Sequence, residues 1–393
     1  MARLNRSHLT HLRGASRLAV EATQGIVDTV EQMHRTIQRG APPLGPGVAE
    51  RTRGVTGFVY RAVRGGVHAA GLGLDALLAP LADALPDGEA SARRLAIVSA
   101  VNGARGDHLA RTGNPLAIPM SLRHRGRPVD PHEPGRGLGE AGAGPARGKV
   151  LVLVHGLCMN DLQWRREGAD HGRALADALG FTPLYLRYNT GRPVGENASE
   201  LAQLLETTLA NWPVPLEELT ILGHSMGGLV ARGACRHALD AGMAWPRRHR
   251  NLVFLGTPHH GAPLERGSQG LVWLLELSPY LAPFTRIDKT VSAGIRDLRH
   301  GSVTGGRWRF VPLPDGVRCF AAAATLGRGL GPVPERVVGD GLVPVDSALG
   351  RHADPALTLA FPEAHQWVGA PMGHLELLSR PEVLEQLLRW LRD

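Results

Sequence analysis

Apolar positions spaced three and four residues apart recur in the first hundred residues, as on one face of a helix. The first stripe is predicted to end at Ala41-Pro42-Pro43. It passes through Leu18, Ala22, Ile26, Val30, Met33 and Ile37. A second stripe, from Phe58 to Leu85, contains four glycines between Gly65 and Gly73 that weaken a helix.

A third helical segment is predicted from Ser91 to Asn102, and Leu116 to Leu122 is a candidate for the first strand. Residues 1–127 are therefore predicted to form a mainly helical N-terminal region. Residues 128–148 are dense in glycine and proline and have no apolar period, which predicts a linker.

From residue 149 to the C-terminus, short apolar runs alternate with helical patterns, which is typical of βαβ units around a parallel sheet. Strands are predicted at Lys149 to Val154, Thr182 to Tyr188, Leu219 to Leu222, Leu252 to Leu255, Val317 to Ala323 and Leu357 to Phe361. Helices are predicted at Ala198 to Asn211 and Pro381 to Leu391. Residues 149–393 are therefore predicted to be an α/β domain with a mainly parallel central sheet.

Composition argues against a disordered chain and against a nucleic-acid-binding protein. The hydrophobic content of 43% and the charged content of 20% are ordinary for a globular domain. The net charge of +8 would attract nucleic acid or an anionic membrane. However, Lys149 and Lys289 are the only lysines, and no run joins basic residues to stacking aromatic residues. We therefore expect no nucleic-acid partner.

Cysteine usage and apolar runs bear on location. Cys158, Cys235 and Cys319 are an odd number and have no metal-ligand spacing, so we expect no disulfide framework. Residues 1–17 are polar and basic, unlike a secretory signal, and no apolar run of about 18 residues is present. We expect a cytoplasmic protein whose membrane contact, if any, is peripheral.

The strongest chemical motif is Gly223-His224-Ser225-Met226-Gly227, which fits G-x-S-x-G, follows a predicted strand and opens a helical segment. A serine at such a turn needs strained backbone angles, and the two glycines remove side chains that would collide there. The pattern predicts that Ser225 is a nucleophile.

A serine nucleophile needs a base, and the base needs a carboxylate that orients it. Asp340, flanked by Gly339 and Gly341, is the favoured acid, and Asp346 is its local rival. His374 directly precedes the closing helix and is favoured as the base over His365. Acyl transfer also needs donors for an oxyanion, and we expect the backbone N–H groups of Leu157 and Met226 to supply them.

Five separated motifs resemble the bacterial lipase/esterase family of the α/β-hydrolase superfamily, over Lys149 to the C-terminus. These are His155-Gly156-Leu157, Gly223 to Gly227, Gly256-Thr257-Pro258-His259-His260-Gly261, Asp340-Gly341-Leu342-Val343-Pro344 and Gly373-His374-Leu375. The resemblance implies an α/β-hydrolase fold with Asp340 as the acid and His374 as the base. Secreted members often hold calcium through an aspartate shortly after the histidine. This sequence has Leu375-Glu376 there, so we expect no metal and no cofactor.

Residues 262–310 are expected to form an inserted helical lid, because the apolar stretch Leu271 to Phe284 falls between two predicted strands. Apolar side chains of this stretch would offer a surface to an acyl chain. They are Trp273, Leu274, Leu277, Tyr280 and Leu281. A helix packed on the core is the alternative. The adjacent His259 and His260 are interpreted as a structural turn, because neighbours at a strand end point apart.

The sequence thus predicts a serine hydrolase that cleaves carboxylic esters, an esterase or lipase acting on a small ester or a lipid through an acyl-enzyme. An acyltransferase with the same three residues is one alternative. The other is a membrane-associated or partner-binding protein that acts through its N-terminal helices, where Arg51, Arg53, Arg61 and Arg64 flank apolar positions.

Overall fold

The computed structural model describes residues 6–38, 61–70, 72–75, 92–142, 144–262, 292–304, 310–327 and 339–392. The chain divides into two compact units. We call Met1–Ser91 with Arg111–Ala117 the helical unit, and Ala92–Ala110 with Ile118–Asp393 the sheet unit.

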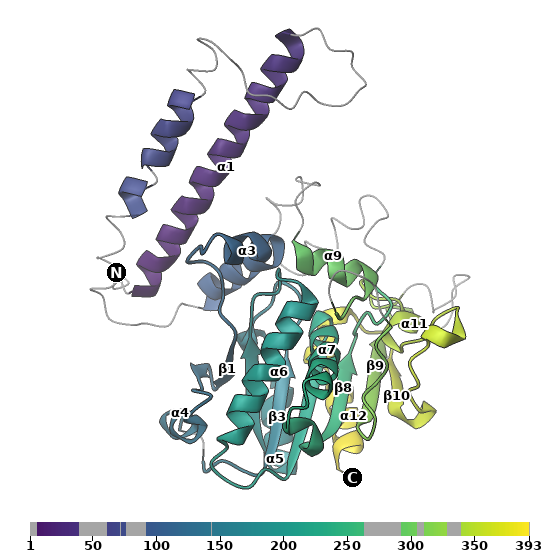
Figure 1. Ribbon diagram of the computed structural model, residues 1–393. Coiled ribbons are helices and arrows are strands. Elements are labelled where there is room, and N and C mark those ends of the chain that lie inside the picture. Colours follow the sequence, from purple (N-terminus) through teal and green to yellow (C-terminus); the bar gives the residue numbers. More distant parts are fainter. Residues whose placement is uncertain are drawn as a thin grey trace. The chain divides into compact units, whose positions relative to one another are not determined.

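The helical unit contains the long helix α1 (Arg6–Gln38) and shorter helical segments at 61–70 and 72–75, so the predicted N-terminal helical region is confirmed (Figure 1). Arg13 and Arg17 of α1 both donate hydrogen bonds to the carboxylate of Asp75. The bonds from Arg17 and then Arg13 lower the pKa of Asp75 to about 2. Among the helices that the structure describes, none is long and apolar enough to cross a membrane.

The sheet unit is built on an eight-stranded sheet with the order β2-β1-β6-β3-β7-β8-β9-β10. Strand β1 runs antiparallel to β2 and β6, and all other neighbours are parallel. The strands are β1 (Ser121–His124), β2 (Arg127–Pro128), β3 (Lys149–Val154), β6 (Phe181–Arg187), β7 (Glu218–His224), β8 (His249–Leu255), β9 (Arg318–Ala324) and β10 (Gln366–Gly369). A separate hairpin joins β4 (Arg165–Arg166) to β5 (Ala169–Asp170). The predicted mainly parallel sheet is confirmed.

Helices cover both faces of this sheet (Figure 1). The α-helices of the unit are α3 (Ala92–Arg111), α4 (Pro134–Glu140), α5 (His171–Leu179), α6 (Val194–Ala210), α7 (Met226–Asp240), α9 (Ala293–His300), α11 (Val345–Ala348) and α12 (Pro381–Leu391). Short 3-10 helices lie at Asp161–Trp164, Trp245–Arg248, Pro355–Leu357, Glu363–His365 and His374–Leu378.

Alternation along β3 separates two apolar clusters. Val150, Val152 and Val154 pack with α6 and α7, whereas Leu151 and Leu153 pack with α5 and α12 on the other face. All five side chains are fully buried. A strand covered on both faces must be apolar throughout, which explains why β3 reads as a continuous apolar run.

One predicted strand was wrong. Leu357 to Phe361 forms part of a 3-10 turn and a loop, and the last strand is β10, which starts five residues later. Leu359 and Phe361 are apolar because they are buried in the core. Strand β10 lies at the edge of the sheet with Val368 42% exposed, so its sequence lacks an apolar run.

Two further segments differ from their prediction. The first strand is β1 at Ser121–His124, because the backbone from Asn114 to Ala117 forms a turn closed by a bond from the Ala117 N–H to the Asn114 carbonyl. The expected linker at 128–148 contains helix α4, whose Leu138 is buried in the core.

Helix α9 lies within the expected lid at 262–310. The residues predicted to contact an acyl chain, Trp273, Leu274, Leu277, Tyr280 and Leu281, lie outside the described residues.

Candidate active site

Ser225 occupies the turn between β7 and α7, with φ 54° and ψ −127°. Its N–H donates to the Leu255 carbonyl at 2.8 Å, which fixes the turn to the neighbouring strand. A Cβ at Gly223 would lie 2.6 Å from the Gly228 backbone, and one at Gly227 would lie 2.1 Å from the Val154 carbonyl oxygen. Glycine is therefore required on both sides of the serine.

Asp340 and His374 come together at the carboxyl end of the strands, where Ser225 also lies. His374 Nδ1 donates to Asp340 Oδ2 at 2.7 Å, and both side chains are buried. The other carboxylate oxygen, Oδ1, accepts from the backbone N–H groups of Leu342 at 3.0 Å and Val343 at 2.8 Å. The His374 N–H also donates to the Asp340 carbonyl at 3.1 Å. The carboxylate and the imidazole are thus held in one fixed orientation.

This orientation leaves His374 Nε2 free. Because Nδ1 carries the proton that bonds Asp340, Nε2 of the neutral ring has a lone pair. Nε2 is buried, and within the described part of the chain no group is bonded to it, the Ser225 hydroxyl included. The ring lies 4.7 Å from that of His224, the residue before Ser225. The hydrogen bond between a catalytic histidine and its serine is often long before a substrate binds.

The loop after β3 reaches the same place. A Cβ on Gly156 would lie 3.0 Å from the Ser225 Cβ, so the loop passes directly beside the serine. The next residue, Leu157, and the first residue of α7, Met226, are fully buried. Among the hydrogen bonds of the described residues, none uses the N–H of either residue. Within the described residues, the loop beside Ser225 and the residue after Ser225 each thus offer a backbone donor without a partner.

Two aromatic residues at this site were not predicted from the sequence. His224 Nε2 donates to the backbone carbonyl of His374 at 3.3 Å, so it helps to hold the backbone that carries the imidazole. Burial, and then the neighbouring His374, hold the pKa of His224 well below its usual value. Trp164 is fully buried and lies edge-to-face with His224, at 6.4 Å between ring centroids. Only the position of His224 inside the G-x-S-x-G motif could have indicated such a role.

The rival residues have other partners. Asp346 is half exposed and pairs with Arg351 at 3.7 Å. His365 donates from Nδ1 to the Cys319 carbonyl at 3.1 Å, and its ring packs on Phe320. In the described part of the chain, neither Asp346 nor His365 is bonded to Asp340 or His374.

His259 and His260 also have separate partners. His259 Nδ1 accepts from Arg232 Nη1 at 3.1 Å, whereas His260 Nε2 donates to the Gly350 carbonyl at 3.0 Å. Among the residues the structure describes, no group of three or more His, Cys, Asp or Glu could hold a metal ion. Cys158 is buried next to Leu157, and burial raises the pKa of its thiol.

Comparisons with known proteins gave a family match over part of the chain and a set of similar solved structures. Residues 145–311 match the family model described as a PGAP1-like alpha/beta domain. No curated protein matches the chain. Similar solved structures include a Bacillus licheniformis lipase in a propeptide form, 18% identical over 62% of this chain and 51% of that one, with a TM-score of 0.40. This chain thus spans about half the length of that lipase.

A lipase-esterase related protein of Clostridium acetobutylicum is 12% identical over 69% of this chain and 99% of that one, with a TM-score of 0.37. The RedJ thioesterase of Streptomyces coelicolor is 16% identical over 62% and 90%, also with a TM-score of 0.37. The sheet unit, with its strand order and its serine turn between β7 and α7, has the α/β-hydrolase fold, and residues 145–311 within it resemble a PGAP1-like alpha/beta domain.

Proposed function

We propose that this protein is a serine hydrolase that cleaves carboxylic esters through an acyl-enzyme intermediate. The observation that carries the proposal is the buried bond from His374 Nδ1 to Asp340, which leaves a bare Nε2 beside the turn that presents Ser225. A nucleophile, a base and an orienting carboxylate are the three groups that this chemistry needs.

The reaction follows from these positions. Ser225 Oγ attacks the ester carbonyl carbon while its proton passes to His374 Nε2, and the carbonyl oxygen becomes an oxyanion. The N–H groups of Leu157 and Met226 donate to this oxyanion, and one such donor contributes about 10²–10³ in kcat. The tetrahedral intermediate then expels the alcohol, which takes the proton from Nε2, and the acyl group stays on Ser225. Water repeats the sequence and releases the acid.

Transfer of the acyl group to an alcohol or a thiol instead of water uses the same groups. The two reactions differ only in the second half, so analysis of products in the presence of a competing alcohol and a competing thiol separates them. A panel of esters of increasing acyl length defines the pocket, because pocket shape sets chain length.

A second candidate function rests on the helical unit. Leu12, Val63, Leu72 and Leu74 are exposed there, by 52%, 45%, 59% and 43%. Exposed apolar side chains on helices with nearby arginines suit peripheral contact with an anionic bilayer. Co-sedimentation of the full-length protein with anionic and neutral vesicles tests this, and equal recovery with both vesicle types contradicts it.

Labelling by a fluorophosphonate tests the hydrolase proposal directly. Ser225→Ala is expected to abolish labelling and ester cleavage with an unchanged circular dichroism spectrum, since it removes only the attacking oxygen. His374→Ala is expected to lose most activity, whereas the matched variant His365→Ala retains most of it. Labelling of another serine would refute the nucleophile, and the reverse ranking of the two histidines would refute the base.

A further inference from the structure

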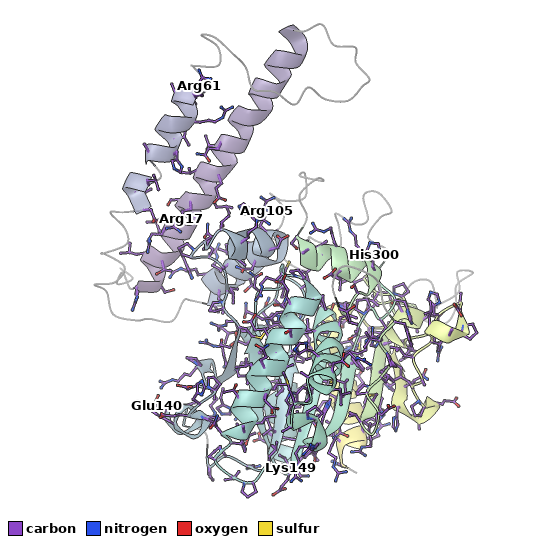
Figure 2. All side chains as sticks on the ribbon, in the orientation of Figure 1. Arg17, Arg61, Arg105, Glu140, Lys149 and His300 are labelled. Carbon is purple, nitrogen blue, oxygen red and sulfur yellow. The ribbon has the colours of Figure 1, made fainter. Side chains whose placement is uncertain are left out.

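Helix α3 packs against the loop that carries the expected oxyanion donor Leu157. A Cβ on Gly103 of α3 would lie 2.1 Å from Cys158 Sγ and 3.1 Å from Cys158 Cα. Helix α3 lies before residue 145, outside the segment that matches the family model. Figure 2 shows Arg105 of α3 and His300 of α9 at one end of the strands and Lys149, the first residue of β3, at the opposite end. Helix α3 therefore lies at the carboxyl end of the strands, where β3 ends and the loop begins.

The loop is held from two sides. On the α3 side, Asn160 Nδ2 donates to Ser99 Oγ at 3.2 Å, and Ser99 Oγ donates in turn to the Leu95 carbonyl at 2.8 Å. On the other side, the Cys158 N–H donates to Thr190 Oγ1 at 3.1 Å. These groups are buried, so no water competes for the bonds. The loop conformation is therefore fixed by its neighbours.

Cys158 itself needs that support. Its φ is 60°, in the left-handed region that a side chain rarely adopts. Residues held in such a conformation persist only where the surrounding structure determines them. Gly103 offers the space that the Cys158 side chain fills in this conformation, and any group larger than hydrogen at position 103 would force Cys158 to move.

We propose that Gly103 is a positioning residue for the oxyanion site: by seating Cys158, it sets the direction of the adjacent Leu157 N–H. The inference rests on the proposed function. Oxyanion donors act over a narrow range of distance, about 2.7–3.1 Å, so a small displacement of the loop weakens them. The carbonyl oxygen of the bound ester interacts less strongly with these donors than the oxyanion does. Displacement of a donor is therefore expected to lower kcat and to leave KM nearly unchanged.

The test is the steric pair Gly103→Ala and Cys158→Gly, assayed with p-nitrophenyl acetate. Gly103→Ala is expected to lower kcat by about tenfold or more, because a displaced donor is worth up to about 10²–10³, and to leave KM within about twofold. Cys158→Gly alone removes the side chain that Gly103 seats and is expected to lower kcat less than Gly103→Ala does, since glycine adopts a positive φ without strain. The double variant Gly103→Ala/Cys158→Gly removes the 2.1 Å conflict and is expected to raise kcat from that of Gly103→Ala to that of Cys158→Gly alone.

A matched control is Gly172→Ala in α5, where a Cβ would lie 2.5 Å from the Tyr185 hydroxyl, in a contact that involves no residue of the loop. It is expected to lower the urea midpoint without lowering kcat. If Gly103→Ala does not fold, Ser99→Ala replaces it, with the same split between kcat and KM expected. Wild-type kcat in Gly103→Ala, or no recovery in the double variant, overturns this inference alone. A wild-type protein inert toward both the ester and the fluorophosphonate overturns the proposed function and this inference with it.

Discussion

Asp340→Asn is the sharpest test of the proposed mechanism, because the structure fixes which atom of the new amide faces the histidine. Asp340 Oδ1 accepts two backbone N–H groups, from Leu342 and Val343. Only an oxygen can keep those bonds, so the asparagine NH2 group must take the place of Oδ2, 2.7 Å from His374 Nδ1. Facing a donor, Nδ1 becomes the acceptor, and the ring proton moves to Nε2. The histidine then cannot accept the Ser225 proton.

A wrong tautomer in a serine–histidine–aspartate site costs about 10⁴ in kcat. At about 1.36 kcal/mol per tenfold change, the expected barrier increase is roughly 4–5.5 kcal/mol for a loss of about 10³–10⁴. KM should change little, because Asp340 is buried and acts through His374. Initial rates with p-nitrophenyl acetate, and the rate of fluorophosphonate labelling, measure this loss.

The matched control is Asp346→Asn, the same substitution six residues away on a half-exposed side chain that pairs with Arg351 at 3.7 Å. An exposed pair of this kind contributes about 0–1 kcal/mol to stability, so activity should stay near that of the wild type. Activity of Asp340→Asn within about tenfold of wild type would refute the tautomer argument, and a larger loss in Asp346→Asn would move the acid there.

Three further outcomes are expected. Ser225→Gly should unfold at a higher urea concentration than Ser225→Ala, because the φ of 54° costs a residue with a Cβ about 1–3 kcal/mol while glycine loses roughly 0.4–1 kcal/mol in chain entropy; an equal or lower midpoint contradicts this. Burial lowers the pKa of His155 and His249 from 6.5 to about 4, so both rings are neutral in the folded protein. The unfolded chain takes up protons on these histidines below pH 6.5, so the free energy of unfolding is highest above that pH and falls toward pH 4. At pH 5.5 the two rings together lower it by about 3 kcal/mol. A urea midpoint that stays flat between pH 7 and 5 would show this wrong. Treatment with EDTA should leave ester cleavage unchanged, and a large, calcium-reversible loss would reveal a metal site.

The central strands could be predicted from the sequence, whereas the edges of the sheet could not. Strand β3 begins and ends at the predicted residues because both of its faces are buried, and burial on two faces leaves an unbroken apolar run. Strand β10 has one neighbour and an exposed Val368, so its pairing with β9 leaves little trace in the sequence. The prediction therefore followed the apolar Leu359 and Phe361 to a segment that is buried without being a strand.

The candidate site divides in the same way. Ser225 lies in a local motif, and its turn is determined by glycines two residues away, so the sequence could place it. The bond between Asp340 and His374 joins residues 34 apart, and it could be expected only from their order along the chain and from the family resemblance. The role of Gly103 leaves no local pattern, because its reason lies in the Cys158 side chain, 55 residues further on. Contacts of that length become visible only when the backbone is in place.

Strain and glycine occur together at this site. Four non-glycine residues in the described part of the chain have a positive φ, and two of them, Ser225 and Cys158, are buried at the carboxyl edge of the sheet. A glycine lies opposite each of them, Gly156 opposite Ser225 and Gly103 opposite Cys158. A methyl group on either glycine would press against the residue opposite. Strained residues persist where their surroundings determine them, and such positions cluster at functional sites. The proposed nucleophile and the neighbour of the proposed oxyanion donor thus share one arrangement: a residue with positive φ whose side chain lies opposite a glycine. A methyl group at either glycine should therefore lower the rate of the proposed reaction more than its effect on stability alone would account for.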